Sequence, residues 1–293
     1  MAYNMYIVEV FGEEKFTGKT VAVILNDGYL PEDIMQKVSR ELKIDRTVFV
    51  NKDDTDEFSL KFFSTKSEID NCIIGNVAAF YSLTKSGYVR PIESGTKKII
   101  SRCGKGRERI YIEYDNYEAM TVELELTTVV SDSNKYEDNE ALSSIYDNSK
   151  GIVIQLEDCD CNCSMGMILF GDKEIFDSIE PNDDIENIIN KDFNISMLHL
   201  LYVEPNNVIH EKSNLFNDSD INKGFTRHYI NTMLYYLRKN DLINYGDIVL
   251  KLHLENGEIL SLKFQYSGDS ETETVRIVGN AHTLVDGVLR IND

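Results

Sequence analysis

The chain has 293 residues, enough for two medium-sized domains, and its 50 carboxylates against 30 lysines and arginines give a net charge of -20. This acidity excludes nucleic acid and an anionic membrane surface as the main partner, because both need a basic footprint. The N-terminus reads as a strand and not as a signal peptide, and no apolar run reaches the about 18 residues that a membrane span needs. Five cysteines, an odd number, suit a reducing compartment. These features predict a cytoplasmic protein.

The first half is predicted to consist of short strands with two helices between them. A helix over residues 30–42 is amphipathic and should lie on the outside. A second helix, opened by Gly75 and closed by Gly87, is apolar on most sides and should be buried. Strands are predicted at residues 6–11, 21–25, 47–50, 58–63, 97–103, 109–114 and 120–126, the last with one wet face because glutamates alternate with apolar residues.

The second half repeats this outline after an acidic linker at residues 131–150, in which a short helix is expected at 139–146. A helix over residues 226–239 should turn four apolar side chains inward: Ile230, Met233, Leu234 and Leu237. Short outer helices are expected at 176–179 and 185–189, with strands at 151–156, 165–170, 197–203, 248–254, 259–266 and 274–278 before a terminal hairpin. Two halves, each a curved, mostly antiparallel sheet around one apolar helix, are the simplest architecture.

The polar segment at residues 64–71 leads into the buried helix, and this junction is the first candidate site. Free N–H groups and the positive end of the dipole at a helix N-terminus favour an anion or a polar substrate. The alternative is a plain core helix with a polar lead-in.

Four segments carry, in their order and spacing, a likeness to a known family: residues 5–25 (MYIVEVFGEEKFTGKTVAVIL), 30–50, 63–72 (FSTKSEIDNC) and 275–287. They resemble the phenazine-biosynthesis (PhzF-like) family, which shares the diaminopimelate epimerase fold. The resemblance implies an α+β protein of two pseudo-symmetric halves, each a barrel-like sheet around a central helix: residues 1–128 with about 283–293, and 129–282. It also implies a cofactor-independent isomerase or epimerase, often a homodimer, with its active site in the cleft between the halves.

The chain departs from the family at the positions that carry the chemistry. The family's proton-shuttling glutamate falls on Arg46, and its neighbouring serine falls on Asp45. An arginine does not release its proton near neutral pH, so Arg46 cannot take over the shuttle. Cys72 occupies the position of the first epimerase thiol, but bulky isoleucines follow it. The corresponding segment of the second half is residues 223–228 (KGFTRH), with a threonine in place of the second thiol.

On this basis the chain offers a set of candidate residues that should meet at the cleft. Arginines suit a carboxylate or phosphate because a guanidinium fork matches these groups. Paired carboxylates or a histidine could exchange a proton near neutral pH. The candidate catalytic residues are Cys72, Asp45 and His228. The candidate substrate-binding residues are Arg46, Glu68, Asp70, Gly75, Asn76, Thr226 and Arg227.

Each candidate also has a structural interpretation. A helix N-terminus should lower the pKa of Cys72 and make it a base, but the thiol could instead be buried and inert. Glu68 and Asp70 could cap their own loop. Arg227 and His228 could simply begin a helix and contact surface acids.

Cys159, Cys161 and Cys163 alternate in the segment EDCDCNCS. Side chains two residues apart share a face of a strand, so the three sulfurs could bind zinc or copper. The alternative is a hairpin tip, because structural zinc sites place two or more residues between cysteines. We expect neither a metal nor a cofactor.

Two functions follow. The first is an isomerase or epimerase that transfers protons on a small anionic metabolite in the cleft. The second is a family member that kept the fold, lost the shuttle, and binds a small molecule or a partner protein. Cys72, Asp45 or His228 within about 3–4 Å of a shared position would favour the enzyme. A cleft filled by bulky side chains would favour the binder: Ile73, Ile74, Phe225 and Arg227.

Overall fold

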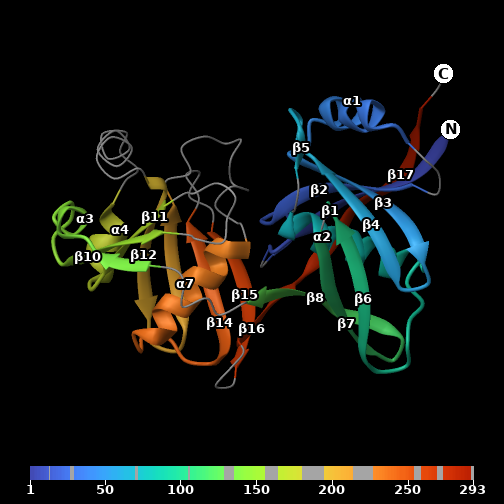
Figure 1. Ribbon diagram of the computed structural model, residues 1–293. Coiled ribbons are helices and arrows are strands. Elements are labelled where there is room, and N and C mark those ends of the chain that lie inside the picture. Colours follow the sequence, from blue (N-terminus) through green and yellow to red (C-terminus); the bar gives the residue numbers. More distant parts are fainter. Residues whose placement is uncertain are drawn as a thin grey trace. The chain divides into compact units, whose positions relative to one another are not determined.

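The chain forms two compact units, seen in a computed structural model (Figure 1). The structure describes residues 1–12, 14–26, 30–69, 72–104, 106–128, 135–155, 164–179, 195–213, 227–253, 259–268 and 273–291. Unit 1 comprises Met1–Leu126 and Arg276–Asp293, and unit 2 comprises Thr127–Val275. Strands dominate both units, so the α+β class predicted from the sequence is confirmed. Among the described residues, no helix has the length and apolar character needed to cross a membrane.

Unit 1 consists of strands that enclose one helix. Its elements are β1 (Ala2–Val10), β2 (Lys19–Leu25), α1 (Glu32–Leu42), β3 (Arg46–Asp54), β4 (Glu57–Phe63), β5 (Glu68–Ile69), α2 (Ile73–Lys85), β6 (Gly95–Cys103), β7 (Gly106–Asp115), β8 (Glu118–Thr128) and β17 (Ala281–Arg290), and β16 (Glu273–Gly279) enters from unit 2. Strand β1 pairs antiparallel with β17 and β2, whereas β2–β3 and β4–β6 are parallel. Helix α1 packs its apolar face on the outside of β3 and β4, as predicted.

The central helix α2 is buried because most of its side chains are apolar. Val77, Ala78, Ala79 and Phe80 have no exposed surface. The Phe80 ring meets Phe58 of β4 edge-on, with 5.8 Å between the ring centroids. The helix contacts β1, β2, β3 and β17 and lies among the strands of unit 1 in Figure 1. The burial predicted from its composition is therefore confirmed.

Helix α2 begins at Ile73, two residues before the glycine that was predicted to open it. The backbone of Cys72 is extended and its Sγ accepts the N–H of Gly75 at 3.4 Å, so the cysteine caps the helix. Gly75 has a packing role instead. A Cβ at this position would lie 2.8 Å from the Phe62 ring and 3.0 Å from Cγ2 of Val48.

The prediction of a wet face at residues 122–126 is wrong. Glu123 and Glu125 of β8 are only 5% and 6% exposed. Glu125 accepts hydrogen bonds from Arg109 Nη1 at 2.6 Å and from Tyr111 OH at 2.7 Å. Arg276 of β16 lies 3.7 Å from Glu123. Alternating acids look the same in sequence whether water or the cations of neighbouring strands face them.

Unit 2 also consists of paired strands, parallel and antiparallel, and α7 (Arg227–Lys239) is the longest helix among its described residues. The elements of this unit are β9 (Lys135–Asp138), α3 (Glu140–Ser143), β10 (Ser149–Gln155), β11 (Ser164–Phe170), α4 (Lys173–Ser178), β12 (Ile195–Glu204), β13 (Val208–Ser213), α7, β14 (Gly246–His253) and β15 (Ile259–Gly268). Most pairs are antiparallel, and β11–β12 and β13–β14 are parallel. The four apolar residues of α7 predicted to face inward are fully buried. The helix expected at 185–189 lies outside the described residues.

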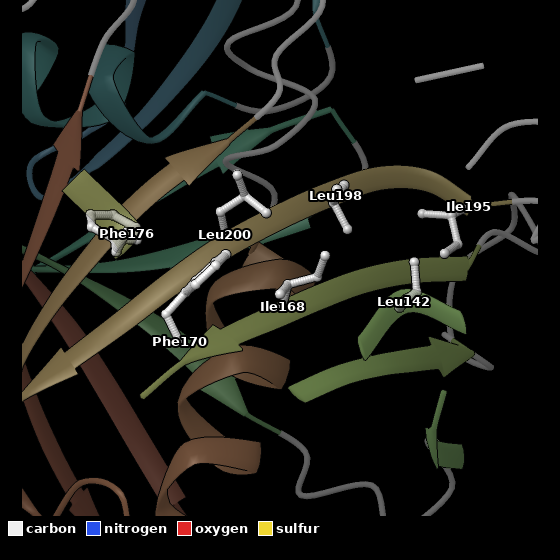
Figure 2. Close-up of a cluster of buried hydrophobic side chains, with 7 residues drawn as sticks. All are labelled: Leu142, Ile168, Phe170, Phe176, Ile195, Leu198 and Leu200. Carbon is white, nitrogen blue, oxygen red and sulfur yellow. The ribbon is translucent and has the colours of Figure 1, made fainter. Parts of the chain in front are cut away.

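One core cluster of unit 2 lies where α3 and α4 meet β11 and β12 (Figure 2). The rings of Phe170 and Phe176 are 5.9 Å apart and nearly edge-on. Strand β11 is almost continuously apolar, which suits a strand covered on both faces. The cluster consists of Leu142, Ile168, Phe170, Phe176, Ile195, Leu198 and Leu200.

Sequence reasoning missed strand β13. The hairpin between β12 and β13 turns at Asn206 and Asn207, whose φ angles are 71° and 60°. Asparagine tolerates this left-handed conformation better than most residues, so the Asn-Asn pair was an available turn signal. The hairpin brings His210 and Glu211 into the sheet beside β12.

Candidate active site

The N-terminus of α2 holds a thiol and a guanidinium side by side. Cys72 is 3% exposed and Arg46, the first residue of β3, is 7% exposed. Arg46 Nη1 donates to the carbonyl of Asp45 at 2.5 Å, whereas its Nε has no hydrogen-bond acceptor among the residues that the structure describes. Buried donors are normally paired, so a buried guanidinium with an unused donor beside a helix N-terminus suits an anion.

Burial raises the pKa of the Cys72 thiol. The Arg46 guanidinium and the N–H groups of Gly75 and Ile74 act in the opposite direction and offset only part of this effect. The lowered pKa predicted from the helix terminus alone is therefore wrong, because removing the thiolate from water outweighs the nearby positive charge. Cys72 stays protonated near neutral pH, and so it suits proton donation better than proton abstraction.

We expect iodoacetamide to modify Cys72 slowly at neutral pH and faster as the pH rises, with a midpoint above the about 8.5 of a free thiol. The thiolate is the reacting form, and burial delays its appearance. Timed labelling with mass spectrometry would measure the rate, and the urea-unfolded chain is the control. Arg46→Met should move the midpoint higher still, because the neighbouring cation is lost. A midpoint below that of the unfolded chain would contradict the buried thiol.

Asn76 ties the cap to strand β6. Its Nδ2 donates to the carbonyl of Cys72 at 3.1 Å, and its Oδ1 accepts from Ser101 Oγ at 2.9 Å. Cys103 Sγ lies 3.2 Å from the same hydroxyl and 3.7 Å from Asn76 Oδ1. Because both ends of the amide bond protein groups, Asn76 positions Cys72 rather than presenting a free amide to a substrate.

Two of the predicted acids lie at the surface of unit 1. Asp45 is exposed, and it is its backbone carbonyl that meets Arg46. Glu68 on β5 is exposed and lies 3.9 Å from Lys61 Nζ. The structure therefore joins Cys72 to Arg46 and leaves these two carboxylates in water.

The remaining candidates cannot be placed in the site. Asp70, Phe225 and Thr226 lie outside the described residues. The backbone of Arg227 and His228 begins α7, and their side chains are also outside the description.

The three alternating cysteines, Cys159, Cys161 and Cys163, lie outside the described residues as well. Within the described ranges, no group of three His, Cys, Asp or Glu side chains converges as a metal site.

A histidine cluster in unit 2 was not predicted from the sequence. His199 and Glu211 are fully buried, with Nδ1 and Oε1 2.6 Å apart. His210 Nδ1 lies 2.9 Å from His253 Nε2, and its Nε2 lies 3.1 Å from Glu204. Burial lowers the pKa of both His210 and His253, so the pair is neutral near pH 7 and can share one proton. These contacts link β12, β13 and β14.

The comparisons with known proteins agree with the fold. A family model described as "Phenazine biosynthesis-like protein" (PhzC-PhzF) matches residues 8–210. The chain is 25% identical to an uncharacterized isomerase of Clostridium acetobutylicum over 99% of both chains. A PhzF-family phenazine biosynthesis protein of Bacillus anthracis has a TM-score of 0.69 at 15% identity, over 99% of this chain and 100% of that one. A hydroxyproline epimerase from Agrobacterium vitis has a TM-score of 0.56 at 10% identity, over 100% and 93%.

The structural likenesses establish an epimerase-type fold, and the family match covers well over half of the sequence. It includes the strand that carries Arg46 and the whole of α2. The resemblance drawn from the sequence is thus confirmed, and the chain belongs to the phenazine biosynthesis-like (PhzC-PhzF) family.

Proposed function

We propose that this chain is an isomerase or epimerase that transfers a proton on a small anionic metabolite, without a cofactor, at the N-terminus of its central helix α2. The observation that carries the proposal is the buried Arg46 guanidinium, which lies beside the Cys72 cap and whose Nε donor has no acceptor in the described part of the chain. Membership of the family and the relative named as an isomerase support the reaction class.

Arg46 and Cys72 have different roles in the proposed reaction. Arg46 stays charged at any working pH, so it can hold a carboxylate in a fixed orientation through parallel N–H bonds. The positive end of α2 adds to the same field. Cys72 keeps its proton near neutral pH and can deliver it to a carbon that has become carbanionic.

A second candidate function is a binding protein that retained the fold without catalysis. The exchange of the family's glutamate for Arg46 favours it, because an arginine strengthens anion binding but cannot shuttle protons. Ile73, which is buried directly after the cap, also narrows the space at the helix terminus.

Incorporation of solvent deuterium, screened over amino acids and cyclic carboxylic acids by NMR, would decide between the two. The wild-type chain should exchange a carbon-bound hydrogen of at least one compound. Arg46→Met should lower kcat/KM for that compound about 100-fold, or about 3 kcal/mol, because a buried charge-assisted bond to the anion is lost. Arg46→Lys should recover part of the loss.

Arg102→Met is the matched control, because Arg102 is a surface arginine of the same unit that pairs with Glu57 at 2.6 Å. The Arg102→Met variant should incorporate solvent deuterium at the wild-type rate. Binding of an acid without exchange would select the binding protein. If Arg46→Met were as active as the wild type, Arg46 would not be the group that binds the substrate anion.

A further inference from the structure

Among the side chains that the structure describes at the α2 terminus, none serves as a proton acceptor for the proposed reaction. Arg46 cannot release or take a proton near neutral pH. Cys72 is protonated there and serves as a donor. The side chains of Asp45 and Glu68 are exposed, whereas Cys72 and Arg46 are buried. Proton transfer on carbon needs a base in hydrogen-bond reach of the reacting atom, so the buried carboxylates of unit 1 are the next groups to consider.

Glu108 is a buried carboxylate on β7, which pairs with β6, the strand that Asn76 links to this cap. It is 3% exposed, although Arg107 and Arg109 on either side of it are exposed. Alternation along β7 therefore turns Glu108 to the inner face, together with Ile110.

The sheet register links Glu108 to the cap. Glu108 lies directly opposite Ser101 in the antiparallel β6–β7 pair, so their side chains share the inner face. Ser101 donates to Asn76, and Asn76 in turn donates to the carbonyl of Cys72. The side chains of Ser101 and Asn76 thus connect the strand pair that carries Glu108 to the backbone of Cys72.

The Glu108 carboxylate is turned toward the end of the β6–β7 hairpin. Its Oε1 lies 3.8 Å from where a Cβ on Gly106 would stand, and Gly106 pairs with Cys103. Cys103 Sγ in turn contacts Ser101 and Asn76. The Glu108 carboxylate, the Ser101 hydroxyl and the Cys103 thiol therefore lie on one inner face of unit 1, where Ser101 and Cys103 contact Asn76 of α2.

We propose that Glu108 is the base that takes the proton from the substrate carbon, with Cys72 as the donor of the returning proton. This inference rests on the proposed function. The C–H bond of the substrate breaks as the Glu108 carboxylate gains the proton, and the electron pair stays on the substrate. The Cys72 S–H bond then breaks as a new C–H bond forms. Exchange with water removes the proton from Glu108 and returns one to Cys72.

The test compares Glu108→Gln with Glu113→Gln in the deuterium exchange assay. Glu113 lies on the same strand but on the opposite face, where it accepts from Thr96. Glu108→Gln should lower kcat about 1000-fold with KM little changed, the range of a lost general base. Glu108→Asp should recover part of the rate. The acidic limb of the wild-type pH–rate profile should disappear in Glu108→Gln, which a merely structural role would not cause.

The outcomes separate this inference from the function on which it rests. Exchange by Glu108→Gln within about threefold of wild type, while Arg46→Met is impaired, would overturn the role of Glu108 alone. A fall in kcat accompanied by a lower melting temperature, with Glu108→Asp equally inactive and the pH profile unchanged, would also overturn it in favour of a structural acid. No exchange by the wild type on any compound would overturn the proposed function and the base together.

Discussion

Replacing Arg238 with methionine is expected to lower the free energy of unfolding of unit 2 by about 3–5 kcal/mol, as breaking a buried ion pair does. Arg238 lies in the last turn of α7, with its Nη2 2.5 Å from Oε1 of Glu273. Glu273 is 5% exposed and also accepts hydroxyl hydrogen bonds from Tyr245 and Tyr266. Methionine fills a similar volume, so the loss comes mainly from a buried carboxylate without its cation.

Urea unfolding followed by tyrosine fluorescence would measure this change, since the chain has no tryptophan. The double variant Arg238→Met/Glu273→Gln should recover part of the stability, because it removes the uncompensated charge. Lys37→Met is the control: its pair with Asp33 is exposed and should contribute less than about 1 kcal/mol. An effect of Arg238→Met no larger than that of the control would contradict the buried pair.

Replacing Gly75 with valine is expected to destabilise unit 1 by about 3 kcal/mol, the upper end of the usual effect of overpacking a core. The new Cβ would stand 2.8 Å from the ring of Phe62, which is itself buried. Helix α2 must then shift, and the Cys72 cap that bonds to the Gly75 N–H shifts with it. We therefore expect the variant to lose both stability and deuterium exchange.

Gly287→Val provides the matched control on β17. A Cβ at Gly287 meets no atom within 4 Å, so the substitution should change stability by less than about 0.5 kcal/mol. Thermal melting of both variants by circular dichroism would compare them directly. Equal melting temperatures for the two would show that α2 tolerates a side chain at its first turn.

Much of the fold was predictable because its signals are local. The burial of α2 follows from a run of small and apolar residues, and the inner face of α7 follows from its helical spacing. The resemblance to the family rested on the order and spacing of four segments, which can be read directly from the sequence. The Asn206-Asn207 turn was equally local, and it was missed because the segment after it is polar.

The chemistry of the site could not be predicted in the same way. Cys72 was correctly assigned to the N-terminus of α2, but the direction of its pKa shift depends on how completely other strands bury it. Glu125 was predicted to face water, and Glu108 was not singled out in the sequence at all. Glu125 is covered by Arg109, and Glu108 is turned inward opposite Ser101.

The sequence by itself determined most of the element types, the burial of the central helix and the family, because periodicity and side-chain size act over a few neighbouring residues. The tertiary structure alone decided which ionisable groups are out of water and which charges they meet. Desolvation and pairing arise from residues distant in the chain, such as Arg46 against Cys72 and β6 against β7, and no local pattern encodes those neighbours.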